Sequence, residues 1–478
     1  MKTAKKLGLL TLVMLIFVPT FGFRNVTTNA VALGPAAIPS WLVVSLFFFL
    51  PLSAFIAELA SANQEKGGGI YSWVECSLGE KWAFISTWSY FVANLFYLQY
   101  VFARLPVMAS WAIFGENRFT DANANLLPYM GMVLCVLLTL VAARGVRSFS
   151  KLSDVGGPLT ILLVVLFIVF AGVGLLLGTP SATAFTAGNV MPDFDITYFA
   201  TFAWLLLAVA GAEVAGTYIT DVDKPSRNFP RGVIIATLFV AAAYIIGSLA
   251  VSLVASPEAL TEAGLANAEY VVYQILAENF GLNGAIMVRL VAFVTFVASI
   301  GGFVVWMESP IRAMFADVPE GTFPRFLTNK DKTGTLKNAL WTQAAVVIVL
   351  IAIPLFGLSG VESFFVLVTN MTALSLVIPY IILVAAYIVF RHKKMEAPFT
   401  MLKADSVAYT AAGVTLALSF AAYLGAGLDY VMGSESTSEA IGLVLQTYAG
   451  PIVLIAVGYG FTWLTKRKYL ATLAAGGK

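Results

Sequence analysis

The stretch FATFAWLLLAVAGAEVAGTY, residues 199–218, decides the fold, because it places a carboxylate inside an apolar run of membrane-spanning length. A lone carboxylate at that depth is costly unless it faces a cavity or a partner, so Glu213 marks a candidate functional site. The neighbouring small residues, Ala210 and Gly211 among them, weaken helical propensity and allow close backbone approach. We therefore predict that the helix is interrupted here.

A matching interruption is predicted in the first apolar segment, where Pro19, Thr20, Phe21 and Gly22 are followed closely by Arg24. Proline deprives a helix of one hydrogen bond and so favours a break. Two interrupted segments in corresponding halves of a membrane protein indicate the binding site of a secondary transporter. A proline can also kink a membrane helix without making a site, and that alternative stays open.

The composition excludes a water-soluble globular protein. The chain has 478 residues, of which 59% are hydrophobic and 11% charged, against about 25% charged residues in typical soluble domains. Apolar runs long enough to cross a bilayer recur along the whole chain. We therefore expect an all-α polytopic membrane protein with twelve transmembrane helices. Their expected ranges are residues 8–33, 39–60, 82–108, 125–143, 157–178, 196–218, 232–255, 284–307, 338–358, 363–390, 406–428 and 446–465.

The basic residues predict the orientation. If the N-terminus is cytoplasmic, all of the 28 lysines and arginines lie on the cytoplasmic side except Arg24, Arg104, Arg118 and Arg289. By the positive-inside rule both termini are then cytoplasmic, and the short loops are typical of a bacterial plasma membrane protein. A secretory signal at the N-terminus is the less favoured reading, because the first apolar stretch is too long for one and carries an arginine.

The order of the spans suggests two halves. Residues 1–178 would form a first five-helix repeat and residues 196–390 a second repeat of inverted orientation, each beginning with a broken helix. Residues 404–466 would add two peripheral helices, within a single transporter domain.

Three loop segments carry a resemblance to a known superfamily. They are EKGGGIYSW at 65–73, DKPSRNFP at 223–230, and SPIRAM at 309–314 with FPRF at 323–326. In these motifs and their order the chain resembles the amino acid–polyamine–organocation (APC) superfamily over nearly its whole length. Residues 21–23 and 68–73 are most similar to the glutamate/GABA antiporter branch.

The resemblance implies the LeuT-type fold, a 5+5 inverted repeat in which helices 1 and 6 are broken. It implies that the substrate, an amino acid or an amine derived from one, is held between the two breaks. It further implies alternating access by rocking of spans 1, 2, 6 and 7 against spans 3, 4, 8 and 9. Where the superfamily typically has Gly-Ser-Gly in span 1, this chain has Pro19, Thr20 and Phe21 followed by Gly22, so the detail of carboxylate binding departs from that pattern.

The expected substrate-binding residues lie at the two breaks and in nearby spans. Glu213 can contact a substrate ammonium group, couple binding to the gates, take up a proton, or serve as a paired structural carboxylate. Arg24 can bind a substrate carboxylate or the side chain of an acidic substrate, or it can form a structural ion pair or a snorkelling contact toward the outer surface. The full expected set is Pro19, Thr20, Phe21, Gly22, Arg24, Tyr90, Trp204, Ala210, Gly211, Glu213 and Phe303. The three aromatic members of this set, in spans 3, 6 and 8, can instead be packing residues.

Charged residues near the inner span ends are candidates for a gate. Glu58 and Glu308 are expected there, where Arg227 or Arg312 can pair with them. On the outer side, Arg104 and Arg289 are expected to pair with Glu116 or another outer acid.

Span 5, residues 155–178, contains no lysine, and the position where proton-coupled relatives often have one falls near Thr160. This absence favours an exchanger (antiporter). The alternatives are a proton- or sodium-coupled uptake permease, in which Ser299 can supply an oxygen ligand, and a non-transporting sensor.

The sequence carries no phosphate-binding loop, nucleophile elbow or metal-ligand cluster, and its single histidine is His392. We therefore expect neither an enzyme nor a bound metal or cofactor. The expected partners are amino acids or amines and the lipid bilayer, without nucleic acid, and a homodimer remains an open alternative to a monomer.

Overall fold

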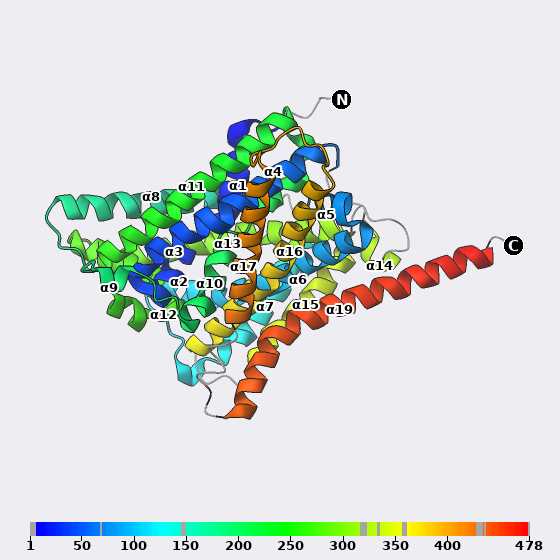
Figure 1. Ribbon diagram of the computed structural model, residues 1–478. Coiled ribbons are helices and arrows are strands. Elements are labelled where there is room, and N and C mark those ends of the chain that lie inside the picture. The colour runs from blue at the N-terminus through cyan, green and yellow to red at the C-terminus, as the bar shows by residue number, and fades with distance from the viewer. Residues whose placement is uncertain are drawn as a thin grey trace. The chain divides into compact units, whose positions relative to one another are not determined.

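Helices make up nearly all of the described chain, because in lipid each backbone polar group has to be satisfied within its own segment (Figure 1). The computed structural model describes residues 6–66, 69–144, 150–315, 323–331, 335–355, 361–426, 434 and 436–476. Within these ranges, β pairing is limited to an isolated bridge between Leu7 and Val222. The expected all-helical class is confirmed for this part of the chain.

The described chain divides into two compact units by its internal contacts. The first unit consists of residues 1–87, 171–262 and 376–447, and the second of residues 88–170, 263–375 and 448–478. Five helices begin in one unit and end in the other. They are α6 (Glu80–Phe114), α8 (Ser150–Leu176), α12 (Pro257–Asn279), α16 (Val361–His392) and α19 (Thr437–Gly476).

The first unit contains both interrupted segments. Its remaining helices are α1 (Leu9–Thr20), α2 (Phe23–Leu33), η1 (Gly34–Ala36), α3 (Ala37–Val44), η2 (Ser45–Phe49), α4 (Leu50–Ala62), α5 (Ile70–Leu78), α9 (Ala187–Val190), α10 (Ile196–Ala208), η5 (Ala212–Asp221), α11 (Pro225–Val254) and α17 (Asp405–Gly425). Helix α11 lies along α1, α2, α3 and α4. Helix α10 packs on α17. The first unit is thus a bundle around α11.

Glycines allow the closest approaches in this bundle. A Cβ added at Gly232 of α11 would lie 2.6 Å from the side chain of Leu12 in α1. A Cβ at Gly425 of α17 would lie 2.6 Å from the backbone of Phe199 in α10. These contacts bring the backbones together, as small residues do at helix interfaces in membranes.

The second unit is built around α7 (Leu126–Ala142), which packs on α13 (Gly284–Phe315) and α15 (Lys337–Ala352). Its short elements are η3 (Asp121–Asn123), α14 (Arg325–Thr328) and η6 (Ile353–Leu355). Polar side chains tie its helices together: the amide of Gln99 in α6 donates to the Leu350 carbonyl at 2.8 Å, and that of Gln343 donates to the Met307 carbonyl at 3.1 Å.

The membrane-spanning character is clear from helix length and composition. Among the described residues, seven helices are long and apolar enough to cross a bilayer, and five shorter apolar helices accompany them. Each of the twelve expected ranges overlaps one of these helices. The count of twelve spans and the inverted repeat remain predictions.

Candidate functional site

The first break lies between α1 and α2. Helix α1 contains Pro19, which lacks the N–H that would bond to the preceding turn. The Thr20 hydroxyl donates to the Ile16 carbonyl at 2.7 Å, and Phe21 then takes an extended conformation. Helix α2 restarts after Gly22. The predicted interruption in the first apolar segment is therefore confirmed.

The second break lies between α10 and η5, and it packs directly on the first. Gly211 has φ +132°, a conformation that side chains rarely adopt. A Cβ at this position would lie 2.6 Å from Thr20 Oγ1 and 3.3 Å from Thr20 Cα. Glycine is thus required both by the backbone angle and by the approach of the two breaks. This confirms the interruption predicted in residues 199–218.

A tyrosine of α11 touches both breaks. The hydroxyl of this residue, Tyr244, lies 2.8 Å from the carbonyl oxygen of Thr20 and 2.8 Å from that of Ala208. These two residues are the last of α1 and of α10. The same oxygen accepts hydrogen bonds from the Gly22 N–H at 3.3 Å and from Asn25 Nδ2 at 3.0 Å. One hydroxyl group therefore connects the ends of two separate helices and the start of a third.

The ring of Tyr244 is held by aromatic neighbours. It stacks on Trp41 of α3, with ring centroids 4.2 Å apart and planes inclined by 5°. It also contacts Phe21 at the first break, at 5.0 Å. The side chain is fully buried. The position of the hydroxyl is thus fixed by packing on two elements of the first unit.

Glu213 faces the second break. The side chain is 3% exposed, and its Oε2 accepts a hydrogen bond from the Gly211 N–H at 3.1 Å. It lies in the first turn of η5, where the helix dipole favours a negative charge. The carboxylate therefore stabilises the break itself, in agreement with a role in coupling or as a structural group.

The structure brings most of the expected substrate-binding residues together in the first unit. Those at the first break are Pro19, Thr20, Phe21, Gly22 and the half-buried Arg24, and those at the second are Ala210, Gly211 and Glu213, with Trp204 buried in α10. The remaining two belong to the second unit. There the ring of Phe303 contacts that of Phe102 in a tilted arrangement, with centroids 4.4 Å apart and planes inclined by 51°, and Tyr90 is half-buried in α6. Substrate contact by any of these residues remains a prediction.

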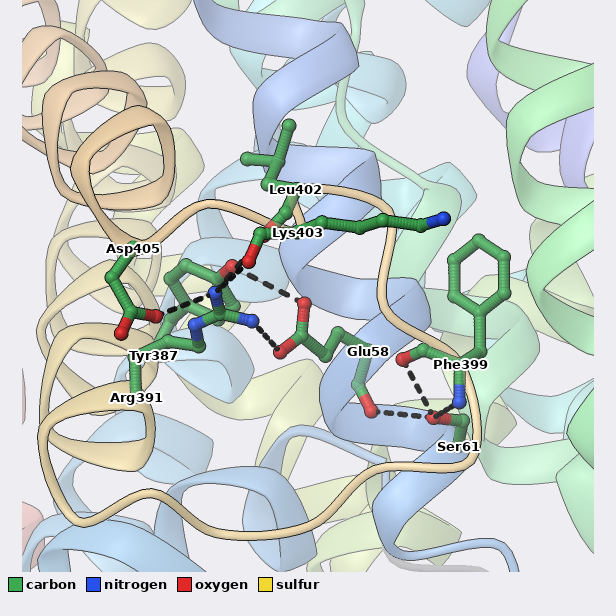
Figure 2. A network of polar contacts seen from close by, with 8 residues as sticks. All are labelled: Glu58, Ser61, Tyr387, Arg391, Phe399, Leu402, Lys403 and Asp405. Carbon is green, nitrogen blue, oxygen red and sulfur yellow. Dashed lines mark hydrogen bonds and ion pairs between the residues drawn. The ribbon is translucent and has the colours of Figure 1, made fainter.

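Glu58 of α4 is the centre of a second polar cluster (Figure 2). Its Oε1 accepts a hydrogen bond from Arg391 Nη1 at 2.8 Å, and its Oε2 accepts one from the Tyr387 hydroxyl at 3.2 Å. Arg391 Nη2 also donates to Asp405 Oδ1 at 2.7 Å and to the Leu402 carbonyl at 3.0 Å. This cluster joins α4 to the end of α16 and the start of α17.

The cluster corrects one expectation. Glu58 was expected to pair with Arg227 or Arg312, whereas its partner is Arg391 at the end of α16. Arg227 is exposed near the start of α11. The side chains of Glu308 and Arg312 lie outside the described part of the structure. A gating role for these four residues remains a prediction.

The expectation for the two outer arginines is met in one case. Arg104 pairs with Glu269 at 3.7 Å, and both side chains are buried in the second unit. This confirms a pairing of Arg104 with an acidic residue of the segment that is predicted to lie outside. Arg289 instead donates from Nη2 to the Phe114 carbonyl at 2.9 Å.

Two important residues, Tyr244 and Arg391, were missed by sequence reasoning. Tyr244 lies in an apolar span, and its hydrogen-bond partners are 36 positions away, at Ala208, and 219 to 224 positions away, at the first break. Arg391 is one of several basic residues in its region of the chain. No local spacing distinguishes either of them. The polar residues that follow Arg24, which include Asn25, Thr27, Thr28 and Asn29, are a nearby sequence signal for a hydrogen-bonding network at the first break.

Comparison with known proteins shows which family and which relatives this chain is similar to. A family model described as amino acid permease matches residues 7–448. An aspartate/glutamate permease of Lactococcus lactis subsp. cremoris is 26% identical over 97% of this chain and 96% of its own. An inner membrane transporter of Salmonella typhimurium is 28% identical, over 88% and 89% respectively. A glutamate/gamma-aminobutyrate antiporter of Lactococcus lactis subsp. lactis is 24% identical, over 74% and 70%.

Proposed function

Because the chain belongs to the amino acid permease family, we propose that it exchanges amino acids, or the amines derived from them, across the cell membrane by alternating access. It is a multi-pass membrane protein of amino acid transport. The substrate is held at the two helix breaks, and one molecule moves inward as another moves outward.

The observation that carries the proposal is the direct packing of the two breaks, with Gly211 against Thr20. Helix α2 begins at this junction of the two breaks, and a helix N-terminus offers N–H donors and a favourable dipole to an anion. Helices α1 and α10 end at the same junction, and the dipole at the C-terminus of a helix favours a cation. An amino acid carries both charges, so its carboxylate and ammonium groups suit opposite sides of this junction.

Acidic amino acids are the proposed substrate class. Arg24 lies in the first turn of α2, next to the break, and guanidinium remains charged in any environment and binds carboxylates well. The aspartate/glutamate permease and the glutamate/gamma-aminobutyrate antiporter among the relatives support the same class. We therefore assign Arg24 to the additional carboxylate of an acidic substrate.

The division into two units supports the proposed motion. The helices expected to rock, spans 1, 2, 6 and 7, correspond to α1–α4, α10, η5 and α11, all in the first unit. The helices expected to form the scaffold, spans 3, 4, 8 and 9, correspond to most of α6 and to α7, α13 and α15, in the second. A group of helices that packs mainly on itself is suited to move as one body.

A second candidate, an uptake permease driven by a proton or sodium gradient, is favoured by one observation. One relative that this chain matches over nearly its whole length is named a permease. The antiporter relative and the lack of a lysine in span 5 favour exchange instead.

Counterflow into proteoliposomes distinguishes the two. The purified protein is reconstituted, vesicles are loaded with one unlabelled amino acid or amine at a time, and uptake of labelled glutamate, aspartate and γ-aminobutyrate is followed. Uptake that requires an internal partner supports exchange. Uptake into empty vesicles under an imposed proton or sodium gradient supports the permease, and protein-free vesicles give the background. The absence of both contradicts transport of these substrates.

A further inference from the structure

We propose that the Tyr244 hydroxyl is a positioning group for the substrate site, which keeps the two helix breaks in register by sharing one proton between the carbonyl oxygens of Thr20 and Ala208. This inference rests on the proposed function, because it concerns the geometry of the same site. Nothing in the sequence pattern or in the family comparison assigns a role to this residue.

The hydrogen-bonding capacity of the hydroxyl is the first step. A phenolic hydroxyl has one proton to donate and accepts through its oxygen lone pairs. The oxygen accepts from the Gly22 N–H and from Asn25 Nδ2. Both carbonyl oxygens lie at the same donor distance, 2.8 Å. The hydroxyl has one proton for two acceptors, which share it in a bifurcated hydrogen bond or receive it in turn as the hydroxyl rotates, so the two carbonyls compete for it.

The second step is the position of these carbonyls in their helices. Thr20 ends α1 and Ala208 ends α10. The last carbonyls of a helix have no donor within that helix and need one from outside. The hydroxyl can serve either helix end without any movement of α11. It therefore links both breaks to one helix, and a rotation of the hydroxyl lets one hydrogen bond strengthen while the other weakens.

Burial alone does not require this arrangement. Tyr198, in the same unit, is also buried, and its hydroxyl bonds to a single side chain, Ser40 Oγ, at 3.2 Å. The hydroxyl of Tyr244 instead touches groups at both breaks. The stacking of its ring on Trp41 keeps it in that place. Tyr198→Phe is therefore a matched control, because it removes the same hydroxyl group at a position that does not contact the breaks.

The test compares Tyr244→Phe with Tyr198→Phe in the reconstituted protein. Both changes keep the ring and remove one hydroxyl. We expect Tyr244→Phe to raise the KM for the transported substrate about tenfold, equivalent to about 1.4 kcal/mol, with a smaller change in maximal rate per folded protein. We expect Tyr198→Phe to leave the KM near that of the wild type. A general loss of folded protein would lower the maximal rate and leave the KM unchanged.

A KM for Tyr244→Phe that equals the wild-type value overturns the inference while leaving the proposed function intact. Absence of transport by the wild type overturns the proposed function and this inference with it. If Tyr244→Phe does not accumulate in the membrane, Asn25→Ala removes one donor to the same hydroxyl and leaves the ring packing in place. It should raise the KM in the same direction but less, and an unchanged KM in this variant also overturns the inference.

Discussion

Glu213 is buried at the second break, where its carboxylate accepts the N–H of Gly211. We expect Glu213→Gln to remain folded in the membrane, because glutamine keeps the shape and an acceptor oxygen. Exchange should fall by about tenfold or more, because hydrogen bonds to charged groups contribute about 1.5–3 kcal/mol. The measurement is the initial rate of counterflow per reconstituted protein.

A control for this change is Glu75→Gln, which removes a partly exposed carboxylate paired with Lys66 and should leave exchange unaltered. Exchange at the wild-type rate in Glu213→Gln would exclude the carboxylate charge from the mechanism.

Arg24 provides a separate prediction about selectivity. If its guanidinium binds the additional carboxylate of an acidic substrate, Arg24→Ala should lose the substrates that carry that carboxylate, γ-aminobutyrate included, and better retain the amino acids and amines that lack it. Counterflow with the panel of amino acids and amines measures this ratio, and Arg118→Ala, an exposed arginine paired with Glu116, serves as the control. Equal loss of both substrate classes would indicate that Arg24 forms a structural ion pair.

At the scale of elements, α1 and η5 are fastened to each other at both ends. Near the break, Gly211 packs on Thr20. At the far end, the Leu7 N–H donates to the Asp221 carbonyl at 2.8 Å, and the Asp223 N–H donates to the Leu7 carbonyl at 2.9 Å. Helix α1 also packs along η5. We expect the two elements to move together during transport.

A disulfide between Leu7→Cys and Val222→Cys tests whether α1 and η5 move together during transport. These residues are bridge partners, and strands pair at about 4.8 Å, within the range that a disulfide spans. The two native cysteines, Cys76 and Cys135, are replaced by serine in the background of this variant, so that only the introduced pair can form a disulfide. Burial raises the pKa of the Cys76 thiol, and a thiol with a raised pKa is oxidised more slowly. Exchange should persist after oxidation. Loss of exchange on oxidation, restored by a reductant, would show that α1 separates from η5.

The Glu58 cluster leads to a stability prediction. In Arg391→Gln the buried Glu58 loses its cation, and breaking a buried pair by removing one partner costs about 3–5 kcal/mol. We expect a lower unfolding temperature in detergent, partly recovered in the double variant Glu58→Gln with Arg391→Gln. Lys393→Gln, which removes an exposed donor to the Ser77 carbonyl, is the control.

The same variants separate fastening from gating. A cluster that only fastens α4 to α16 and α17 leaves exchange per folded protein unchanged in the double variant. An altered exchange rate would favour the gating role predicted for Glu58. An unfolding temperature in Arg391→Gln that equals the wild-type value would contradict the stabilising role.

The breaks could be predicted from sequence because their causes are local. Pro19, Gly22 and Gly211 disfavour a continuous helix wherever they occur, and Glu213 marks its own position by its charge. The tertiary partners could not be predicted in the same way. Arg391 lies one turn after Tyr387, so both share a helix face, but sequence does not say that Glu58 lies opposite that face.

At the scale of the whole molecule, membership of the amino acid permease family agrees with the apolar helices and with the resemblance in the loops. The grouping of helices into two units was anticipated only as an implication of that resemblance. It depends on which apolar faces pack together, and apolar spans of similar composition do not encode this in any local pattern.

The most direct test of exchange is a double-label experiment on the wild type. Proteoliposomes are loaded with one labelled member of the best substrate pair and placed in a solution of the other member, which carries a different label. Both labels are counted in the same samples over time. Exchange predicts that influx and efflux proceed one for one and that both stop when either substrate is omitted. Influx that continues at the same rate into vesicles without internal substrate would contradict it.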